Sequence, residues 1–202
     1  MKGMKEDFYS QNRWQNWINK VRESNFKLTD PEDKNAGAVF VYIMDDVVLA
    51  CLKVIARNER DIITMEEAIA EINNIKDIVF QEQESLGDDA DLMLQSLRTS
   101  LVAVFVSCQR YISGDFDRQT SLEDLVRKAV AAEEEENLDE TFDILSQVGS
   151  RIIGGESLPD MEDLPYSMTA ELLDGIDAIS AAMIGDDSYK EDDGSIEAGE
   201  EF

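Results

Sequence analysis

The segment that most constrains the fold runs from Ala36 to Ala56 and is apolar on nearly every side of a helix. Its only charged residues are Asp45, Asp46 and Lys53. The segment is too long for one strand, and no turn residue divides its β-branched runs, so it predicts a helix over about residues 33–58. A helix without a polar face needs protein around it, so we expect this one to be the central, most buried element.

Helical periodicity continues through most of the chain. Thr64 with Glu67 forms a capping-box signature at the start of one further helix. The predicted fold is all-α: a helical bundle of about six to seven helices in a single domain, residues 1–185, with a disordered acidic tail at 186–202. The central apolar helices are expected within 33–112 and shorter, acidic helices within 120–185. Besides the segment above, helices are predicted at 6–23, 64–83, 89–112, 121–136, 137–153 and 170–184.

The charge of the chain is strongly negative and unevenly spread. There are 45 acidic and 18 basic residues, for a net charge of −27. Residues 133–202 hold 22 of the acidic residues and only 2 of the basic ones. Such a surface repels nucleic acids and anionic lipid headgroups, so direct binding to either is not expected. The acidity either serves solubility alone or favours a protein partner with a basic surface.

The chain contains no histidine, which excludes several classes of active site. Histidine-dependent triads, histidine-ligated zinc and di-iron bundles all require that side chain. Gly154-Gly155 lacks the spacing of a phosphate-binding loop and marks the end of a helix instead. We therefore expect no cofactor and favour a protein that is not an enzyme.

Targeting signals are also missing from the sequence. Residues 1–12 are polar and charged, and the longest apolar stretch ends at Asp45. Neither a secretory signal nor a membrane span is predicted, so we expect a cytoplasmic protein. Cys51 and Cys108 lie in separate apolar helical runs, which predicts two buried thiols, with a bridge between the helices as the alternative.

Asp45 and Asp46 are the most unusual candidates for a functional site, because they interrupt an otherwise apolar helix. A buried carboxylate without a partner is costly, so each must pair with a cation, reach solvent or become protonated. Arg98 and Arg110, the basic residues of the predicted helix at 89–112, are the expected partners. An ion pair or an exposed edge is favoured over a metal or catalytic site.

Trp14 and Trp17 form an aromatic stripe with Phe8 and Tyr9 near the start of the chain. Aromatic residues at helical spacing usually lie in the core. If the first helix instead packs loosely, the two tryptophans would be anchors for a partner.

Further carboxylates suggest a magnesium site, since oxygen atoms are the ligands that this ion prefers. Most of them lie in the first turn of a predicted helix, where the helix dipole already explains acidic residues. Their spacing also differs from that of the paired glutamates in helical nucleotide hydrolases. The residues are Glu66, Glu67 and Glu71 in one helix and Asp88, Asp89 and Asp91 in the next.

Three groups of residues together identify a known family. The groups are Phe8-Tyr9 with Arg13-Trp14 and Trp17, Asp45-Asp46 with the run from Val47 to Ile55, and the run from Leu172 to Met183. As a set they resemble an uncharacterised archaeal family, domain of unknown function 2150, over most of residues 6–185. The resemblance implies a helical, cytoplasmic protein from a methanogen or a salt-adapted relative. It implies no activity and no functional residue.

Three hypotheses for function follow from the sequence. The leading one is a non-enzymatic, acidic helical module that binds another protein. The first alternative is a carboxylate- and magnesium-dependent hydrolase of nucleotides or phosphates, which needs acids from separate helices to converge in a pocket. The second is a nucleic-acid mimic that binds a basic protein, which needs ordered rows of carboxylates.

Overall fold

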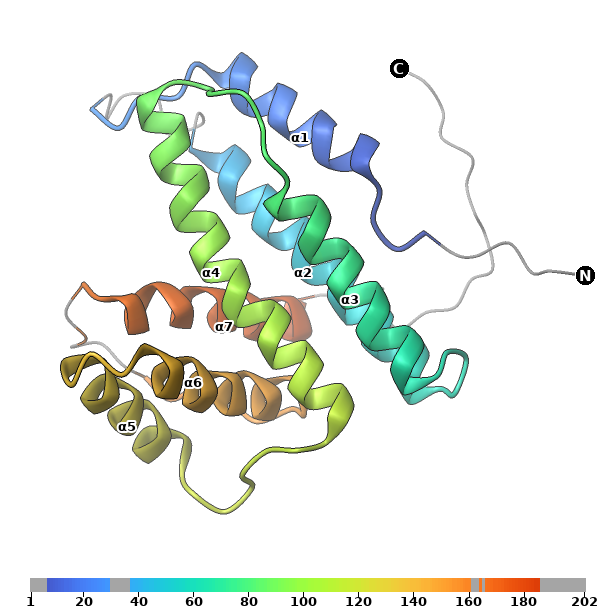
Figure 1. Ribbon diagram of the computed structural model, residues 1–202, viewed down its shortest axis with the longest axis vertical. Coiled ribbons are helices and arrows are strands. Elements are labelled where there is room, and N and C mark those ends of the chain that lie inside the picture. Colours follow the sequence, from blue (N-terminus) through green and yellow to red (C-terminus); the bar gives the residue numbers. More distant parts are fainter. Residues whose placement is uncertain (1–6, 30–36, 161–163, 165, 186–202) are drawn as a thin grey trace, which may run out of the picture.

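The computed structural model describes residues 7–29, 37–160, 164 and 166–185, and within these ranges it consists of seven helices without a strand (Figure 1). The predicted all-α fold is confirmed. The tail predicted at residues 186–202 lies outside the described residues. The helices are α1 (Gln11–Ser24), α2 (Ala38–Glu59), α3 (Met65–Phe80), α4 (Asp88–Ser113), α5 (Leu122–Glu134), α6 (Leu138–Ile153) and α7 (Met168–Gly185).

Helix α4 joins the two halves of the bundle. It packs against α2 and α3 on one side and against α6 and α7 on the other, while α1 covers α2 and α5 covers α6 (Figure 1). The sequence predicted this central place for α2. Helix α2 does bury eleven of its residues, but it lies beside α4 and its outer face is in solvent, where Val41 is 60% exposed and Tyr42 is 58% exposed. An apolar composition on all sides therefore did not require burial on all sides.

Among the described helices, α4 has the length and apolar composition of a membrane span. Ten of its residues are nevertheless buried, including Leu101, Val104 and Phe105. The central helix of a packed bundle meets the same criteria of length and composition, and the contacts of α4 with four other helices explain its apolar character.

Close contacts between α4 and the helices α6 and α7 depend on small residues. A Cβ atom added to Gly149 would lie 1.9 Å from the hydroxyl oxygen of Ser107. A Cβ atom added to Gly175 would lie 2.1 Å from the carbonyl oxygen of Ser100. Real side chains do not approach so closely, so these glycines set how near the helices can lie.

Helix ends carry the caps that local sequence predicts. The Thr64 hydroxyl accepts a hydrogen bond from the Glu67 amide, and the Glu67 carboxylate accepts one from the Thr64 amide at 2.8 Å, so the capping box is confirmed. The side chains of Ser121 and Asn137 accept hydrogen bonds from the amides of Asp124 and Glu140, and so cap α5 and α6.

The N-terminus of α7 has a cap from a different helix. The Glu133 carboxylate, at the end of α5, accepts hydrogen bonds from the amides of Met168 at 2.8 Å and Thr169 at 2.9 Å. Burial opposes ionisation of Glu133, but the hydrogen bonds from Thr169 and Met168 outweigh it and lower the pKa of this carboxyl group. The carboxylate thus ties the α5–α6 hairpin to α7.

Replacement of Gly175 by alanine tests the contact between α4 and α7. The added methyl group would collide with the backbone of α4, so we expect Gly175→Ala to lower the free energy of unfolding by about 2–3 kcal/mol. Gly37→Ala is the matched control, because the new Cβ would lie 3.7 Å from Phe26 in a right-handed helical conformation. Urea denaturation measures both, and equal stabilities of the two variants would contradict the role of the contact.

The cap on α7 predicts a specific pH dependence. Because the pKa of Glu133 is lowered by folding, its contribution is complete above the ordinary value of 4.5 and is lost as the pH falls through the folded-state pKa. We expect Glu133→Gln to cost about 1 kcal/mol at pH 7 and almost nothing in strong acid. The exposed neighbour Glu134, changed to glutamine, is the control. Identical profiles of unfolding free energy against pH for the two variants would show that Glu133 does not cap α7.

Candidate functional site

Asp46 links α1 to α2. Its carboxylate accepts two hydrogen bonds from the Arg13 guanidinium: Nε donates to Oδ2 at 3.0 Å, and Nη2 donates to Oδ1. The indole nitrogen of Trp17 donates a third hydrogen bond, to Oδ2 at 2.7 Å. The side chain of Asp46 is only 14% exposed. Burial raises the pKa of the Tyr9 hydroxyl, and the neighbouring Asp46 carboxylate raises it further. Asp46 is therefore an ion-paired residue that holds α1 in place.

The prediction that Arg98 or Arg110 pairs with Asp46 was wrong. The Arg98 guanidinium donates to the carbonyl oxygens of Val79 and Gln81 at the end of α3. Arg110 pairs with Asp143 of α6. The basic partner comes from α1 instead, because α1 lies along α2 where Asp46 emerges, and sequence periodicity could not place these two helices together.

Asp45 points away from the contact that Asp46 makes. It is exposed on α2, and partial burial raises the pKa of its carboxyl group. Adjacent residues on a helix differ in direction by about 100°, so one aspartate meets α1 and the other meets solvent. The pair therefore does not act as one site.

The tryptophans also have separate environments. Trp14 is fully buried in the core, with the Arg98 guanidinium 5.7 Å from the centre of its ring. Trp17 is partly buried, donates to Asp46, and has the Lys20 ammonium 4.3 Å from its ring centre. Both rings are thus used in packing α1.

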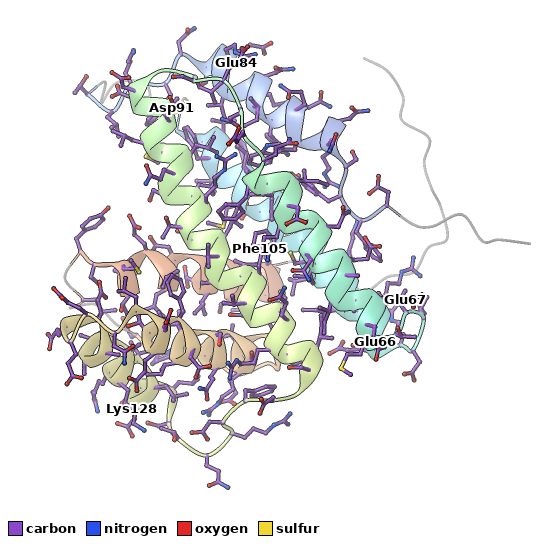
Figure 2. The ribbon with its side chains drawn as sticks, in the orientation of Figure 1. Glu66, Glu67, Glu84, Asp91, Phe105 and Lys128 are labelled. Carbon is purple, nitrogen blue, oxygen red and sulfur yellow. The ribbon has the colours of Figure 1, made fainter. Side chains whose placement is uncertain are left out.

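The carboxylates considered as magnesium ligands do not converge. Figure 2 shows Glu66 and Glu67 at one end of the α3–α4 pair and Asp91 at the other. Asp91 accepts hydrogen bonds from Ser85 and from the Leu86 amide. Within the described ranges, no group of three or more cysteine, aspartate or glutamate residues is placed to hold a metal ion. Five of these acids lie in the first turn of α3 or α4, whereas Glu71 is buried farther along α3.

The two cysteines lie next to each other inside the bundle. Cys51 of α2 and Cys108 of α4 are fully buried free thiols. Burial raises the pKa of Cys51, and its contact with Cys108 raises it further. Cys51 is therefore protonated at neutral pH, and both buried cysteines pack as small apolar side chains.

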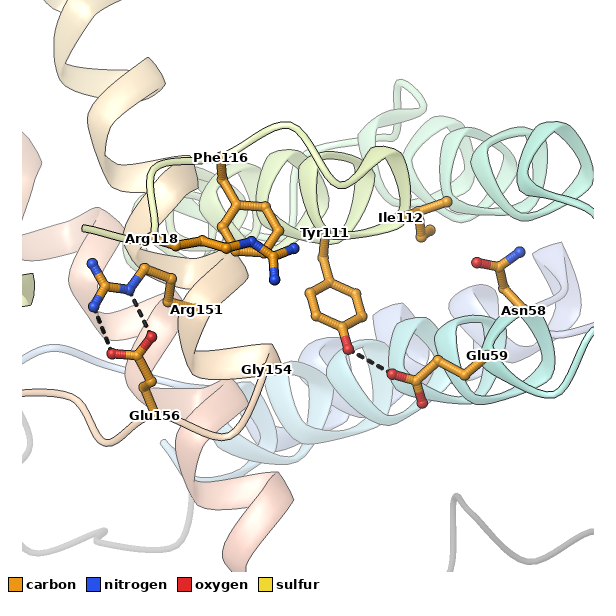
Figure 3. Close-up of a pocket in the computed structure, with 9 residues that line it drawn as sticks. All are labelled: Asn58, Glu59, Tyr111, Ile112, Phe116, Arg118, Arg151, Gly154 and Glu156. Carbon is orange, nitrogen blue, oxygen red and sulfur yellow. Dashed lines mark hydrogen bonds and ion pairs between the residues drawn. The ribbon is translucent and has the colours of Figure 1, made fainter. Parts of the chain in front are cut away.

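One concave site, which we call the terminal cleft, lies where α2, α4 and α6 end (Figure 3). Its polar chamber has a volume of about 440 Å³ and contains Arg118, Arg151, Glu59 and Glu156. An apolar chamber of about 290 Å³ adjoins it, and the two chambers share Glu59, Tyr111 and Gly154. The remaining lining residues are Asn58, Ile112 and Phe116 in the polar chamber and Leu52, Ile55, Ala56, Ile153, Gly155 and Met183 in the apolar one.

Several contacts fix the polar chamber. Arg151 donates two hydrogen bonds to Glu156, both at 2.7 Å, and a third to the carbonyl oxygen of Thr120. The Tyr111 hydroxyl donates to Glu59 at 2.6 Å. The Tyr111 ring stacks on Phe116, whose ring lies 4.4 Å from the Arg118 guanidinium. The chamber therefore presents an ordered set of charged and aromatic groups.

A second concave site, which we call the side groove, lies between α3, α4 and the start of α6. It has a volume of about 660 Å³. Three half-buried apolar side chains line it, Ile69, Val106 and Phe142, one from each helix. Polar groups surround them. These groups are Asn73, Gln109, Arg110, Ser113, Asp115, Asp139, Asp143 and Ser146.

Sequence reasoning found neither concave site. Each is built from segments far apart in the chain, and no short motif marks either of them. The only local signal was Arg118, a basic residue close to aromatic Phe116 in a region dominated by acids.

Comparison with known protein families places the chain in one that is already defined. The model of a family described as "Uncharacterized protein conserved in archaea (DUF2150)" matches residues 7–192. No curated protein and no solved structure matches the chain.

The two adjacent aspartates form a matched pair for mutation. We expect Asp46→Asn to lower the free energy of unfolding by about 1–2 kcal/mol, because it removes the charge that Arg13 and Trp17 bind. Asp45→Asn should change stability by less than about 0.5 kcal/mol, and in the stabilising direction, since burial disfavours the ionised form of Asp45. Urea denaturation at pH 7 measures both values. A larger loss for Asp45→Asn than for Asp46→Asn would contradict the assigned contacts.

Proposed function

The chain belongs to the archaeal family DUF2150, and from the side groove we propose that it is a non-enzymatic interaction module that binds a basic, amphipathic helix of another protein. The observation that carries this proposal is an apolar floor with an acidic rim, formed where three helices pack together. A groove of this kind accepts the apolar face of a helix.

The charges of the rim favour a basic occupant. Asp115, Asp139 and Asp143 line the groove and are exposed. Arg110 is the one basic residue of the lining, and it already contacts Asp143 and the carbonyl oxygen of Asp115. The rim therefore retains a net negative charge, which attracts lysine and arginine side chains and speeds their association.

The apolar floor of the side groove adds a hydrophobic contribution to the electrostatic attraction of the rim. Ile69, Val106 and Phe142 remain half-buried without an occupant. Covering their exposed apolar surface would contribute about 25 cal/mol for each Å² removed from water. An amphipathic helix satisfies both requirements, because its apolar face meets the floor while its basic residues reach the rim.

The two alternative functions have weaker support. A magnesium-dependent hydrolase needs several carboxylates around one ion, and the described residues offer no such cluster. A nucleic-acid mimic needs regular rows of acids, whereas many carboxylates here cap helices or bind arginine, as Glu67, Glu133 and Asp46 do.

Affinity capture from the native archaeal cells, with wild-type and variant chains in parallel, tests the proposal. We expect the wild type to retain a protein with a basic, helical segment. Phe142→Glu should reduce its recovery at least tenfold, because the variant places a charge on the apolar floor. Asp139→Lys should also reduce recovery, and raised salt should weaken binding to the wild type.

Two control variants make the same kinds of substitution outside the side groove. Leu92→Glu makes the same kind of change at an exposed position of α4 that does not line the groove. Asp124→Lys reverses a charge in the first turn of α5, as Asp139→Lys does in α6. Equal recovery with Phe142→Glu and Leu92→Glu would overturn the proposal, as would an absence of specific capture at low salt.

A further inference from the structure

The terminal cleft supports a second inference, which does not depend on the function proposed for the side groove. The two sites share no lining residue. We propose that the terminal cleft binds a small zwitterion: an α-amino acid with an aliphatic side chain. Its carboxylate would meet Arg118, its ammonium group would meet Glu59, and its side chain would enter the apolar chamber.

Two of the four charged side chains in the cleft are available for a ligand. Arg151 and Glu156 neutralise each other through a two-pronged ion pair (Figure 3). Within the part of the chain that the structure describes, no carboxylate forms an ion pair with Arg118, although acidic residues outnumber basic ones more than twofold. The exposed side chain of Arg118 lines the chamber, and its guanidinium lies over the Phe116 ring (Figure 3).

Glu59 provides the opposite pole. One of its oxygens accepts the hydrogen bond from Tyr111, and a carboxylate has room for several more donors. Helices α2, α4 and α6 end around the cleft, so their terminal carbonyl groups add negative partial charge. This side of the chamber therefore favours an ammonium group.

The charges that line the polar chamber favour a zwitterionic ligand over a simple anion or cation. The four charged groups of the chamber, Arg118, Arg151, Glu59 and Glu156, sum to zero. A simple anion would be repelled by the net charge of −27 and by the helix ends, while a simple cation would meet Arg118. A ligand with both charges and no net charge avoids both penalties.

The apolar chamber selects the side chain. It is lined by Leu52, Ile55 and Met183, among others, and adjoins the polar chamber at Tyr111 and Glu59. Its volume of about 290 Å³ accepts a branched aliphatic group. Each methylene buried there should strengthen binding by about fourfold.

Calorimetric titration of the full chain tests the proposal with four defined probes: leucine, glycine, 3-methylbutylamine and 4-methylpentanoate. The amine is leucine without its carboxylate, and the acid is leucine without its ammonium group. We expect leucine to bind most tightly, glycine at least tenfold more weakly, and neither single-charge analogue to match leucine. Failure of leucine to bind at millimolar concentration, or equal binding of the acid or the amine, would overturn the proposal.

Three variants locate the site. Arg118→Ala removes an exposed side chain and should weaken leucine binding at least tenfold without unfolding the protein. Met183→Glu places a charge in the apolar chamber and should reduce leucine binding to the level of glycine. Arg127→Ala is the control, since this exposed arginine lies on α5 outside the cleft. Unchanged leucine binding in Arg118→Ala would show that the cleft is not the site, whatever the side groove binds.

Discussion

The close approach of α4 to α6 and α7 is the constraint on which the remaining structure depends. Gly175 leaves no room for a side chain against the backbone of Ser100, and Gly149 leaves none against the small side chain of Ser107. This contact brings the α1–α3 half and the α5–α7 half together around one helix. Helices that meet through backbone and small side chains have little freedom to slide, so the surfaces formed at their edges have fixed shapes.

Charge in this acidic chain is used largely to hold elements together. Asp46 binds Arg13 and Trp17 and so attaches α1. Glu133 caps α7 from the end of α5, and Glu156 neutralises the nearly buried Arg151. Asp46 and Glu133 each join two different helices, and Glu156 attaches the segment after α6 to that helix. The net charge is high, but these acids have specific partners that offset their repulsion.

Both concave sites are consequences of the same packing. Because α6 crosses α4 near Ser107 and Ser150, the C-terminal part of α4 contacts two separate spaces. Arg110 lines the side groove, while Tyr111 lines the terminal cleft. One space has an apolar floor with an acidic rim, and the other has balanced charges beside an apolar chamber. This difference in chemistry is why we propose two different ligands, a basic helix for the side groove and a small zwitterion for the terminal cleft.

The sequence by itself determined the helices, their approximate limits and several of their ends. The capping box at Thr64 and the aromatic core position of Trp14 depend on residues within a turn or two, where periodicity is informative. Tertiary structure alone decided which faces meet. Asp46 pairs with Arg13, 33 residues away, rather than with either expected arginine, and α4 took the central place expected for α2. Both concave sites arise from side chains on different helices, and the energy that selects such contacts is spread over many weak packing interactions that leave no local pattern in the chain.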